Sequence, residues 1–288
     1  MGVIWLVWGS TYLAIRIAVL QLPPVLFAGA RFALAGVLMF VYAWLRGARL
    51  PRSRVDWQRI AVSGFALLVA GNGLVTWSEQ TVESNQAALI VATSALWIAG
   101  FGVLGASGER VTPLTLAGLL LGFAGVAVLV GSGITARLAP VSAYCALLLA
   151  PLMWSAGSIY SRRHPVSVAP AMTAALQMCI SGVVLGALGF SLGEAPRWHA
   201  QPQAYAALAY LVVFGSCVAY GAYYWLVHEV TPATLGTYAY VNPAVAVLLG
   251  GWLLDERLTT AQVWGTVIIL SGVVLVTLSA RRRSGAAK

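Results

Sequence analysis

The sequence predicts an all-α polytopic membrane protein of ten transmembrane helices, arranged as two inverted five-helix repeats. Three observations lead to this fold class. Hydrophobic residues make up 60% of the 288 positions and charged residues only 9%, whereas a soluble domain carries roughly 25% charged residues. Unbroken apolar runs of about 20 residues, long enough to cross a bilayer, follow one another along the chain. The same marker residues also recur in the second half at a constant offset.

The predicted spans are separated by short connections, which is typical of antiparallel neighbours. The first span begins directly after Met1, which leaves open a short first helix or a chain that extends upstream. Thr112-Pro113 and Thr231-Pro232 open the fifth and ninth spans, because threonine caps helices and proline suits the first helical position. The spans are predicted at residues 2–20, 24–45, 58–79, 85–106, 113–131, 141–161, 168–192, 203–226, 232–254 and 260–280.

Arginines mark one side of the membrane. With a cytoplasmic N-terminus, the basic residues of 46–59, Arg110, Arg162-Arg163 and the tail 281–288 all fall in the cytoplasm. This is the positive-inside pattern, and it predicts a plasma (bacterial inner) membrane protein with both termini cytoplasmic. The net charge of +9 is explained by these loops, so no nucleic-acid partner is predicted. The sequence does not fix an oligomeric state, and a monomer is compatible with it.

A shift of 146–147 positions brings the two halves into register. Each half holds five spans, and because five is odd the second copy must insert upside down relative to the first. The predicted domains are a first repeat at 1–132, a second, inverted repeat at 140–280 and a basic cytoplasmic tail at 281–288. The matching markers are Trp8 with Trp154, Arg16 with Arg162, Pro24 with Pro170, Gly36 with Gly182, and Glu109-Arg110 with Glu256-Arg257.

Polar groups inside the spans are candidate functional residues, because they are costly in a bilayer and usually face a cavity or a partner. Arg31 suits an anionic group such as a carboxylate, or else it bonds a neighbouring helix or snorkels outward. Its repeat partner is Gln177. Asn72 needs partners in a dry environment, and its neighbours Gly71 and Gly73 either loosen the third span or allow close packing.

Trp8, Tyr12 and Arg16 share one helix face, with Thr11 beside them, and Trp154, Ser158 and Arg162 repeat that spacing. Either these are cavity-facing stripes or they are ordinary helix packing with small polar contacts.

Glu79 ends the third span and is a possible proton site, although an exposed loop-end carboxylate is the simpler interpretation. GxxxG at Gly118/Gly122 and Gly182/Gly186 predicts close helix contact. No phosphate loop, HExxH motif, paired intramembrane aspartates or Ser-His-Asp set is present, so no enzyme, metal or cofactor is predicted.

Over essentially its whole length the sequence resembles the EamA-type permeases of the drug/metabolite transporter superfamily, and among them the YedA-like exporters. The matching stretches are Trp8-Gly9-Ser10-Thr11-Tyr12, Pro23-Pro24 with Gly29-Ala30-Arg31-Phe32, Gly71-Asn72-Gly73 through Glu79, Tyr238-Ala239-Tyr240-Val241-Asn242-Pro243, and Glu256. The resemblance implies a central cavity between the two halves and export of small metabolites by alternating access. Ala95 stands where the family usually has a proline, so a regular fourth span is expected and the hinge is placed at Pro243, with Gly71 and Gly73.

The predicted function is export of a small metabolite, most simply an amino acid or a related compound. A multidrug or organic-cation exporter is the alternative, against which the intramembrane arginines argue. Pro243 removes a backbone donor and frees the carbonyl of Ala239 near mid-membrane. Protons are a possible coupling ion. The predicted substrate-binding residues are Trp8, Thr11, Tyr12, Arg31, Asn72, Gln177, Tyr238, Tyr240 and Asn242.

Overall fold

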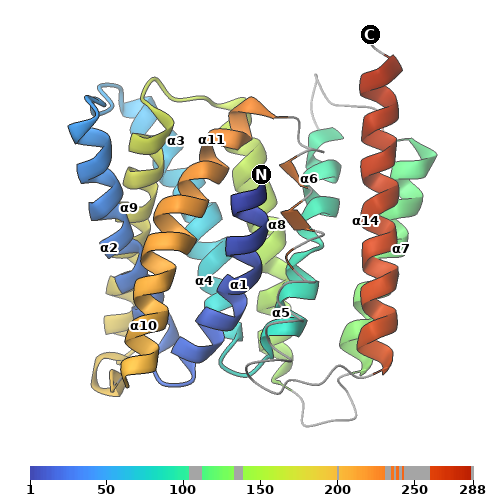
Figure 1. The fold of residues 1–288 in the computed structure, drawn as a ribbon, viewed down its shortest axis with the longest axis horizontal. Coiled ribbons are helices and arrows are strands. Elements are labelled where there is room, and N and C mark those ends of the chain that lie inside the picture. The colour runs from blue at the N-terminus through green and yellow to red at the C-terminus, as the bar shows by residue number, and fades with distance from the viewer. Residues whose placement is uncertain are drawn as a thin grey trace.

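The computed structural model describes residues 1–103, 112–132, 139–199, 201–230, 235–236, 238–239, 242 and 260–286. Within these ranges the regular elements are all helices, which form one bundle (Figure 1). Six described stretches are long and apolar enough to cross a bilayer: Gly2–Val19, Pro24–Leu45, Arg54–Ser78, Val141–Arg163, Pro170–Ser191 and Pro202–Glu229. For the described residues, the prediction of an all-helical membrane protein is confirmed.

The first half of the chain starts with two long helices and continues with a span of mixed helical type. Its elements are α1 (Gly2–Val19), α2 (Pro24–Leu45), α3 (Arg54–Gly64), the π-helical stretch η1 (Phe65–Asn72), α4 (Gly73–Ser78), α5 (Ser84–Val91), α6 (Ser94–Val103) and α7 (Pro113–Ser132). The helix boundaries lie within a turn or so of the predicted ones.

The second half repeats this plan. Its elements are α8 (Val141–Arg163), α9 (Pro170–Ser191), the short 3₁₀ turn η3 (Ala195–Arg197), α10 (Pro202–Tyr210), the π-helical stretch η4 (Leu211–Tyr220), α11 (Gly221–Glu229) and α14 (Thr260–Ala286). Of the ninth predicted span, 232–254, only Leu235, Gly236, Tyr238, Ala239 and Asn242 are described.

Prolines explain where α2 and α9 begin. Pro24 and Pro170 occupy the first turn, where a missing N–H costs nothing because those donors have no helical partner. The start of α2 has no side-chain cap from its own N-cap residue, Pro23. Instead, the buried Glu194 carboxylate of the second half accepts the Leu26 N–H at 2.7 Å. The two halves are therefore joined at this helix terminus.

A π-helical stretch occupies the corresponding place in each half. Leu211, which opens η4, follows Phe65, which opens η1, by 146 positions. π-Helical turns are rare and are found mostly at functional sites. The chain stays helical through Gly71-Asn72-Gly73, so the predicted interruption takes the form of a widened helix that ends at Asn72.

The fourth span is broken, and the expectation of a regular helix there is wrong. Helix α5 ends at Val91 and α6 starts at Ser94. The Thr93 N–H and Thr93 Oγ both bond the Ile90 carbonyl, at 3.1 and 2.7 Å. These contacts three residues apart tighten the turn, since a threonine hydroxyl competes with the helical backbone pattern. A proline is therefore not needed for the break.

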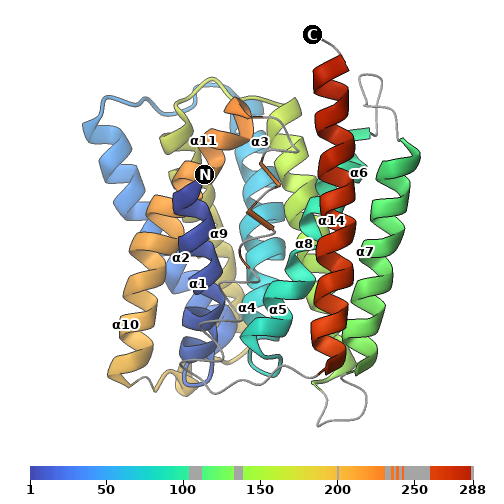
Figure 2. The same cartoon turned by 45° about the vertical axis from the view of Figure 1, so that its right-hand side comes forward.

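Helices of one half pack on helices of the other. α2 lies along α9 and α7 lies along α14, and both views show each pair side by side (Figures 1 and 2). A Cβ on Gly182 would lie 2.5 Å from the Ala33 nitrogen, and one on Gly272 would lie 2.6 Å from the Gly122 nitrogen. Close contact at the GxxxG motifs is thus confirmed for Gly182 and Gly122.

Candidate functional site

A cavity lies inside the bundle, between the two halves. It encloses about 60 Å³ of space that water molecules can enter, and a volume of about 10–15 Å³ already suffices for one water molecule. Its described wall consists of Trp8, Thr11, Tyr12, Ile15, Arg31, Phe32, Leu68, Gly71, Asn72, Val75, Val91, Ala150, Pro151, Trp154, Gly215, Ser216, Tyr220, Tyr238 and Asn242. Both π-helical stretches contribute to this wall.

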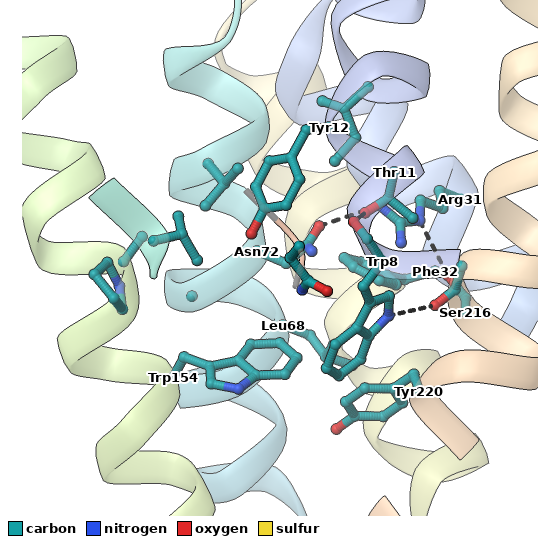
Figure 3. Close-up of a pocket in the computed structure, with 18 of the residues that line it drawn as sticks. Trp8, Thr11, Tyr12, Arg31, Phe32, Leu68, Asn72, Trp154, Ser216 and Tyr220 are labelled. Atoms are coloured by element: carbon teal, nitrogen blue, oxygen red, sulfur yellow. Dashed lines mark hydrogen bonds between the residues drawn. The ribbon is translucent and has the colours of Figure 1, made fainter. Parts of the chain in front are cut away.

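The charged group of the cavity wall is Arg31 of α2. Its side chain is only 3% exposed. The guanidinium donates from Nε to Ser216 Oγ at 3.0 Å and from Nη1 to Asn72 Oδ1 at 3.3 Å (Figure 3). Its Cζ also lies 5.1 Å from the centre of the Phe32 ring. Both hydrogen bonds go to neutral acceptors, so neither of them brings a negative charge to the guanidinium.

The two acceptors come from the two π-helical stretches. Asn72 is the last residue of η1, and Ser216 lies inside η4. The Asn72 carbonyl groups are further held by Thr76, whose Oγ1 donates to the backbone oxygen at 2.9 Å. Arg31 is therefore hydrogen-bonded to residues of both halves of the chain.

Gly215 makes room for this arrangement. A Cβ at this position would lie 3.1 Å from Arg31 Nη2 and 3.1 Å from Thr11 Cγ2, closer than ordinary side-chain contacts. The Gly215 carbonyl also accepts Trp8 Nε1 at 3.2 Å. A glycine at this position therefore lets Arg31 and Thr11 keep their places, which a side chain would shift by a few tenths of an ångström.

The rings of Trp8, Trp154 and Tyr220 lie together on one side of the cavity, whereas the Phe32 ring lies beside Arg31 (Figure 3). The Trp8 and Trp154 ring centres lie 5.3 Å apart, edge to face, and Trp8 contacts Tyr238 at the same distance. The Trp154 and Tyr220 ring centres lie 6.2 Å apart. Such edge-to-face pairs stabilise one another beyond the area they bury.

The polar atoms of these rings are bonded to protein groups. Trp154 Nε1 donates to Tyr223 OH at 3.0 Å, and Tyr223 OH lies 2.6 Å from Ser158 Oγ. Tyr220 OH donates to Gln177 at 2.7 Å. The aromatic end therefore presents mainly carbon surface to whatever enters the cavity.

The remaining predicted wall residues are Thr11, Tyr12 and Asn242. Thr11 Oγ1 donates to the Trp8 carbonyl at 2.7 Å, and Tyr12 is 8% exposed. In the orientation that satisfies both neighbours, the Asn242 amide nitrogen donates to the carbonyls of Tyr238 and Trp5 at 3.1 Å.

The structure brings most of the predicted substrate-binding residues together, namely Trp8, Thr11, Tyr12, Arg31, Asn72, Tyr238 and Asn242. Gln177 is fully buried and is not among the described wall residues. Of the two glycines predicted as hinges, Gly71 lines the cavity and Gly73 faces Leu185 instead. Tyr240 and Pro243 lie outside the described residues.

Glu79 is fully buried, so its interpretation as an exposed loop-end carboxylate is wrong. It ends α4, and its backbone carbonyl accepts Arg16 Nη1 of α1. The carboxylate interacts electrostatically with Arg31 and Tyr12. The neighbouring helix α1 therefore covers the residue that the sequence pattern places at a helix end.

Several wall residues were not predicted. Trp154 was indicated by its match with Trp8, as one of two interpretations of the stripe. Ser216 and Tyr220 lie in an apolar run where periodicity gives no warning, and Gly215 is one of 30 glycines in the chain. Only the repeat indicates these residues, because η4 occupies the place in the second half that η1, with Asn72, occupies in the first.

The fold and the cavity define the class: a polytopic helical membrane protein with an internal site for a small molecule. Among the described residues, no three His, Cys, Asp or Glu side chains are grouped closely enough to hold a metal ion. The chain belongs to the EamA-like transporter family, which matches residues 3–131 and again residues 141–278.

Relatives and a solved structure match nearly the whole chain. The inner membrane transporter YedA of Escherichia coli K12 is 38% identical over 276 residues, which cover 96% of this chain and 88% of YedA. A protein of the same organism named "probable amino-acid metabolite efflux pump" is 23% identical over 289 residues, covering 96% and 93%. A crystal structure that is 24% identical superposes with a TM-score of 0.71, covering 96% of both chains, and supports the fold.

Proposed function

We propose that this protein exports small amphipathic metabolites that carry a carboxylate, amino acids or related compounds in the first place, across the inner membrane by alternating access. The observation that carries the proposal is the cavity itself, with the buried Arg31 at one end and the rings of Trp8, Trp154 and Tyr220 at the other. A molecule with an anionic head and an apolar body matches both ends.

Arg31 supports the anionic head. A guanidinium presents five N–H donors, and its hydrogen bonds to Asn72 and Ser216 use two of them. Charged groups are costly at this depth, and those that persist usually serve a substrate or ion pathway. Paired N–H groups also match the geometry of a carboxylate better than that of a neutral group.

The names of two relatives agree with export as the direction of transport and with the inner membrane as the location. YedA is named as an inner membrane transporter, and a second relative as an amino-acid metabolite efflux pump. At 23% identity the second name counts as support for a substrate class and not for a particular compound.

Alternating access rests on the inverted repeat, which several contacts support. Arg16, near the end of α1, bonds Glu79, and Ala143, near the start of α8, accepts Ser78 Oγ at 3.0 Å. The end of α1 and the start of α8 therefore lie beside the same helix terminus, so the two first helices run in opposite directions. The reciprocal pairs α2 with α9 and α7 with α14 fit a pseudo-two-fold axis between them.

The proposed topology has ten spans, repeats at 1–132 and 140–280, and both termini in the cytoplasm. The α2–α3 connection, the α8–α9 connection and the C-terminal end of α14 lie toward the same end of the bundle as the N-terminus (Figure 1). Together with the adjoining helix ends, these segments hold nine of the 16 arginines of the chain, at positions 46, 49, 52, 54, 162, 163, 281, 282 and 283, which supports a cytoplasmic assignment. The basic tail 281–288 belongs to that side.

Protons remain the proposed coupling ion, with Glu79 as the carrier. A buried carboxylate near Arg31 and Tyr12 is suited to exchange a proton with the cavity. The hinge is proposed at Pro243, Gly71 and Gly73. A Glu79→Gln variant tests this role. If its efflux keeps the full response to an imposed pH gradient, Glu79 is not the proton carrier.

The test is efflux from proteoliposomes that hold the purified protein. Vesicles are loaded separately with labelled leucine, phenylalanine, glutamate or tetraethylammonium, and release is compared with protein-free vesicles. Leucine or phenylalanine is expected to leave faster in the presence of the protein, and Arg31→Ala is expected to remove most of the difference. If none of the amino acids leaves faster than from empty vesicles, the proposal is wrong.

One observation favours the organic-cation exporter as a second candidate. Aromatic rings bind cations on their faces, and the described cavity wall has six aromatic residues, namely Trp8, Tyr12, Phe32, Trp154, Tyr220 and Tyr238. Arg31 opposes it, because a fixed positive charge repels a cation. Release of tetraethylammonium alone in the same assay would favour this second candidate.

A further inference from the structure

A hydrogen-bonded chain leaves the aromatic end of the cavity and runs behind its wall. Tyr220 lines the cavity, but its hydroxyl donates to Gln177 Oε1 at 2.7 Å. Gln177 Nε2 donates to Ser63 Oγ at 2.7 Å, and Ser63 Oγ donates to the Arg59 carbonyl at 2.6 Å. Ser63 Oγ also lies 3.2 Å from the Ile60 carbonyl. Each group donates to the next one, so the chain of hydrogen bonds has one direction, from Tyr220 toward α3.

All three side chains of this chain are buried. Gln177 is 0% exposed, and Ser63 and Tyr220 are each 2% exposed. A buried amide needs partners for both its oxygen and its nitrogen, and leaving either unmade is expensive. Gln177 has one partner for each, which fixes the direction of its amide.

The backbone around Gln177 is shaped to receive it. A Cβ at Gly64 would lie 3.2 Å from both Cα and Cβ of Gln177. Gly64 is also the last residue of α3 before the π-helical stretch, and its carbonyl accepts Ser181 Oγ at 3.2 Å. Two side chains of α9 therefore bond the α3–η1 junction, and the glycine lets α9 approach closely enough for this.

Tyr220 connects Gln177 with the cavity, because its hydroxyl bonds Gln177 and its ring lines the cavity wall. It is the last residue of η4, and its ring lies edge to face with Trp154, with centres 6.2 Å apart. Both rings belong to the cavity wall. Without the bond to Gln177 the Tyr220 hydroxyl loses its buried partner, and the cost of an unpaired buried hydroxyl favours a shift of the ring within its packing.

We propose that Gln177 is a positioning residue for substrate selection: it holds the Tyr220 ring as a fixed wall of the aromatic end and does not touch the substrate. This inference rests on the proposed function. It also replaces the sequence-based expectation that Gln177 binds the polar end of the substrate together with Arg31, since both of its polar ends already serve Tyr220 and Ser63.

The experiment measures efflux of labelled leucine and phenylalanine from proteoliposomes for Gln177→Met, Tyr220→Phe and the double variant. Methionine keeps the length of the side chain but offers no amide. Losing one buried hydrogen bond predicts a KM raised about three- to tenfold, with Vmax nearly unchanged. Because the two residues act through one bond, the double variant is expected to match the single variants rather than to multiply their effects.

Gln203→Met is the matched control, because the same change at an exposed position leaves KM unaltered. If Gln177→Met fails to fold, Tyr220→Phe and Ser63→Ala test the same chain from its two ends. An unchanged KM in Gln177→Met, a fall in Vmax alone, or multiplicative effects in the double variant overturn the inference. A wild-type protein that moves neither amino acid overturns the proposed function and this inference with it, an outcome distinct from the others.

Discussion

Arg31 and Gln177 occupy corresponding positions in the two halves, 146 residues apart, and the structure gives them different tasks. Arg31 reaches the cavity and is gripped by Asn72 and Ser216. Gln177 reaches Ser63 and Tyr220 behind the wall. Both belong to the tightly packed pair α2 and α9. A duplicated frame thus carries residues with different contacts at corresponding positions, which fits the proposed substrate with its two unlike ends.

A contact at the helix ends is repeated in the two halves, although the residues at positions 31 and 177 differ. Arg16 bonds the carbonyl of Glu79 at the end of α4, and its counterpart Arg162 bonds the carbonyls of Val227 and Val230 at the end of α11, at 2.9 and 2.6 Å. Each arginine satisfies helix-end carbonyls that lack partners within their own helix. This helix-end contact is repeated in both halves, whereas the polar residues around Arg31 are not, since Asn72 and Thr11 correspond to Val218 and Gly157.

The largest effect is expected from exchanging the two side chains. Arg31→Gln should lower Vmax/KM for leucine by about 100-fold, because losing a buried charged donor costs more than losing a neutral hydrogen bond. Adding Gln177→Arg should not restore transport, since position 177 points behind the wall. Efflux from proteoliposomes measures both, with the exposed Arg52→Gln as control. Recovery in the double variant would mean that the two positions are interchangeable.

A smaller effect is expected from Asn72→Asp. The new carboxylate would lie where an acceptor now sits 3.3 Å from Arg31 Nη1, and it would compete with a substrate carboxylate for the guanidinium. KM for leucine should rise about 30-fold, which is the ratio that a loss of about 2 kcal/mol predicts. If Arg31 only joins the two halves, the added ion pair should instead leave KM unchanged, and a concentration series of leucine distinguishes these results.

The sequence predicts the frame of this molecule well, because bilayer thickness and charge cost leave strong marks. Arg31 stands out because a charge inside an apolar span is rare, and Trp154 is indicated because it matches Trp8. The spans follow from their length and from the prolines that open them. These signals are local or repeated, so no knowledge of neighbouring helices is needed to interpret them.

The sequence could not predict which neighbours a side chain meets. Glu79 looks exposed at the end of a span but is buried by contact with α1. Gln177 is polar like Arg31 and occupies the corresponding position of the second half, yet its hydrogen-bond partners come from α3 and η4. The π-helical stretches that bring Asn72 and Ser216 to the Arg31 guanidinium leave no mark in the spacing of the hydrophobic residues. The break at Thr93 arises from a hydrogen bond of its hydroxyl group, which the spacing of hydrophobic residues does not reveal either.

The smallest of these effects is expected from Gly215→Ala, and it tests how tightly the Arg31 site is fitted. The new methyl group would lie 3.1 Å from both Arg31 Nη2 and Thr11 Cγ2, so the guanidinium must shift by a few tenths of an ångström. Overpacking of this kind costs about 1–3 kcal/mol, and we expect about a tenfold rise in KM for leucine with a folded protein. Gly186→Ala is the matched control, since a Cβ there meets nothing within 4 Å. Equal effects of the two alanines would show that Gly215 serves helix packing in general. A rise confined to Gly215→Ala would assign its effect to the fit around Arg31 and Thr11, where the two halves of the chain differ.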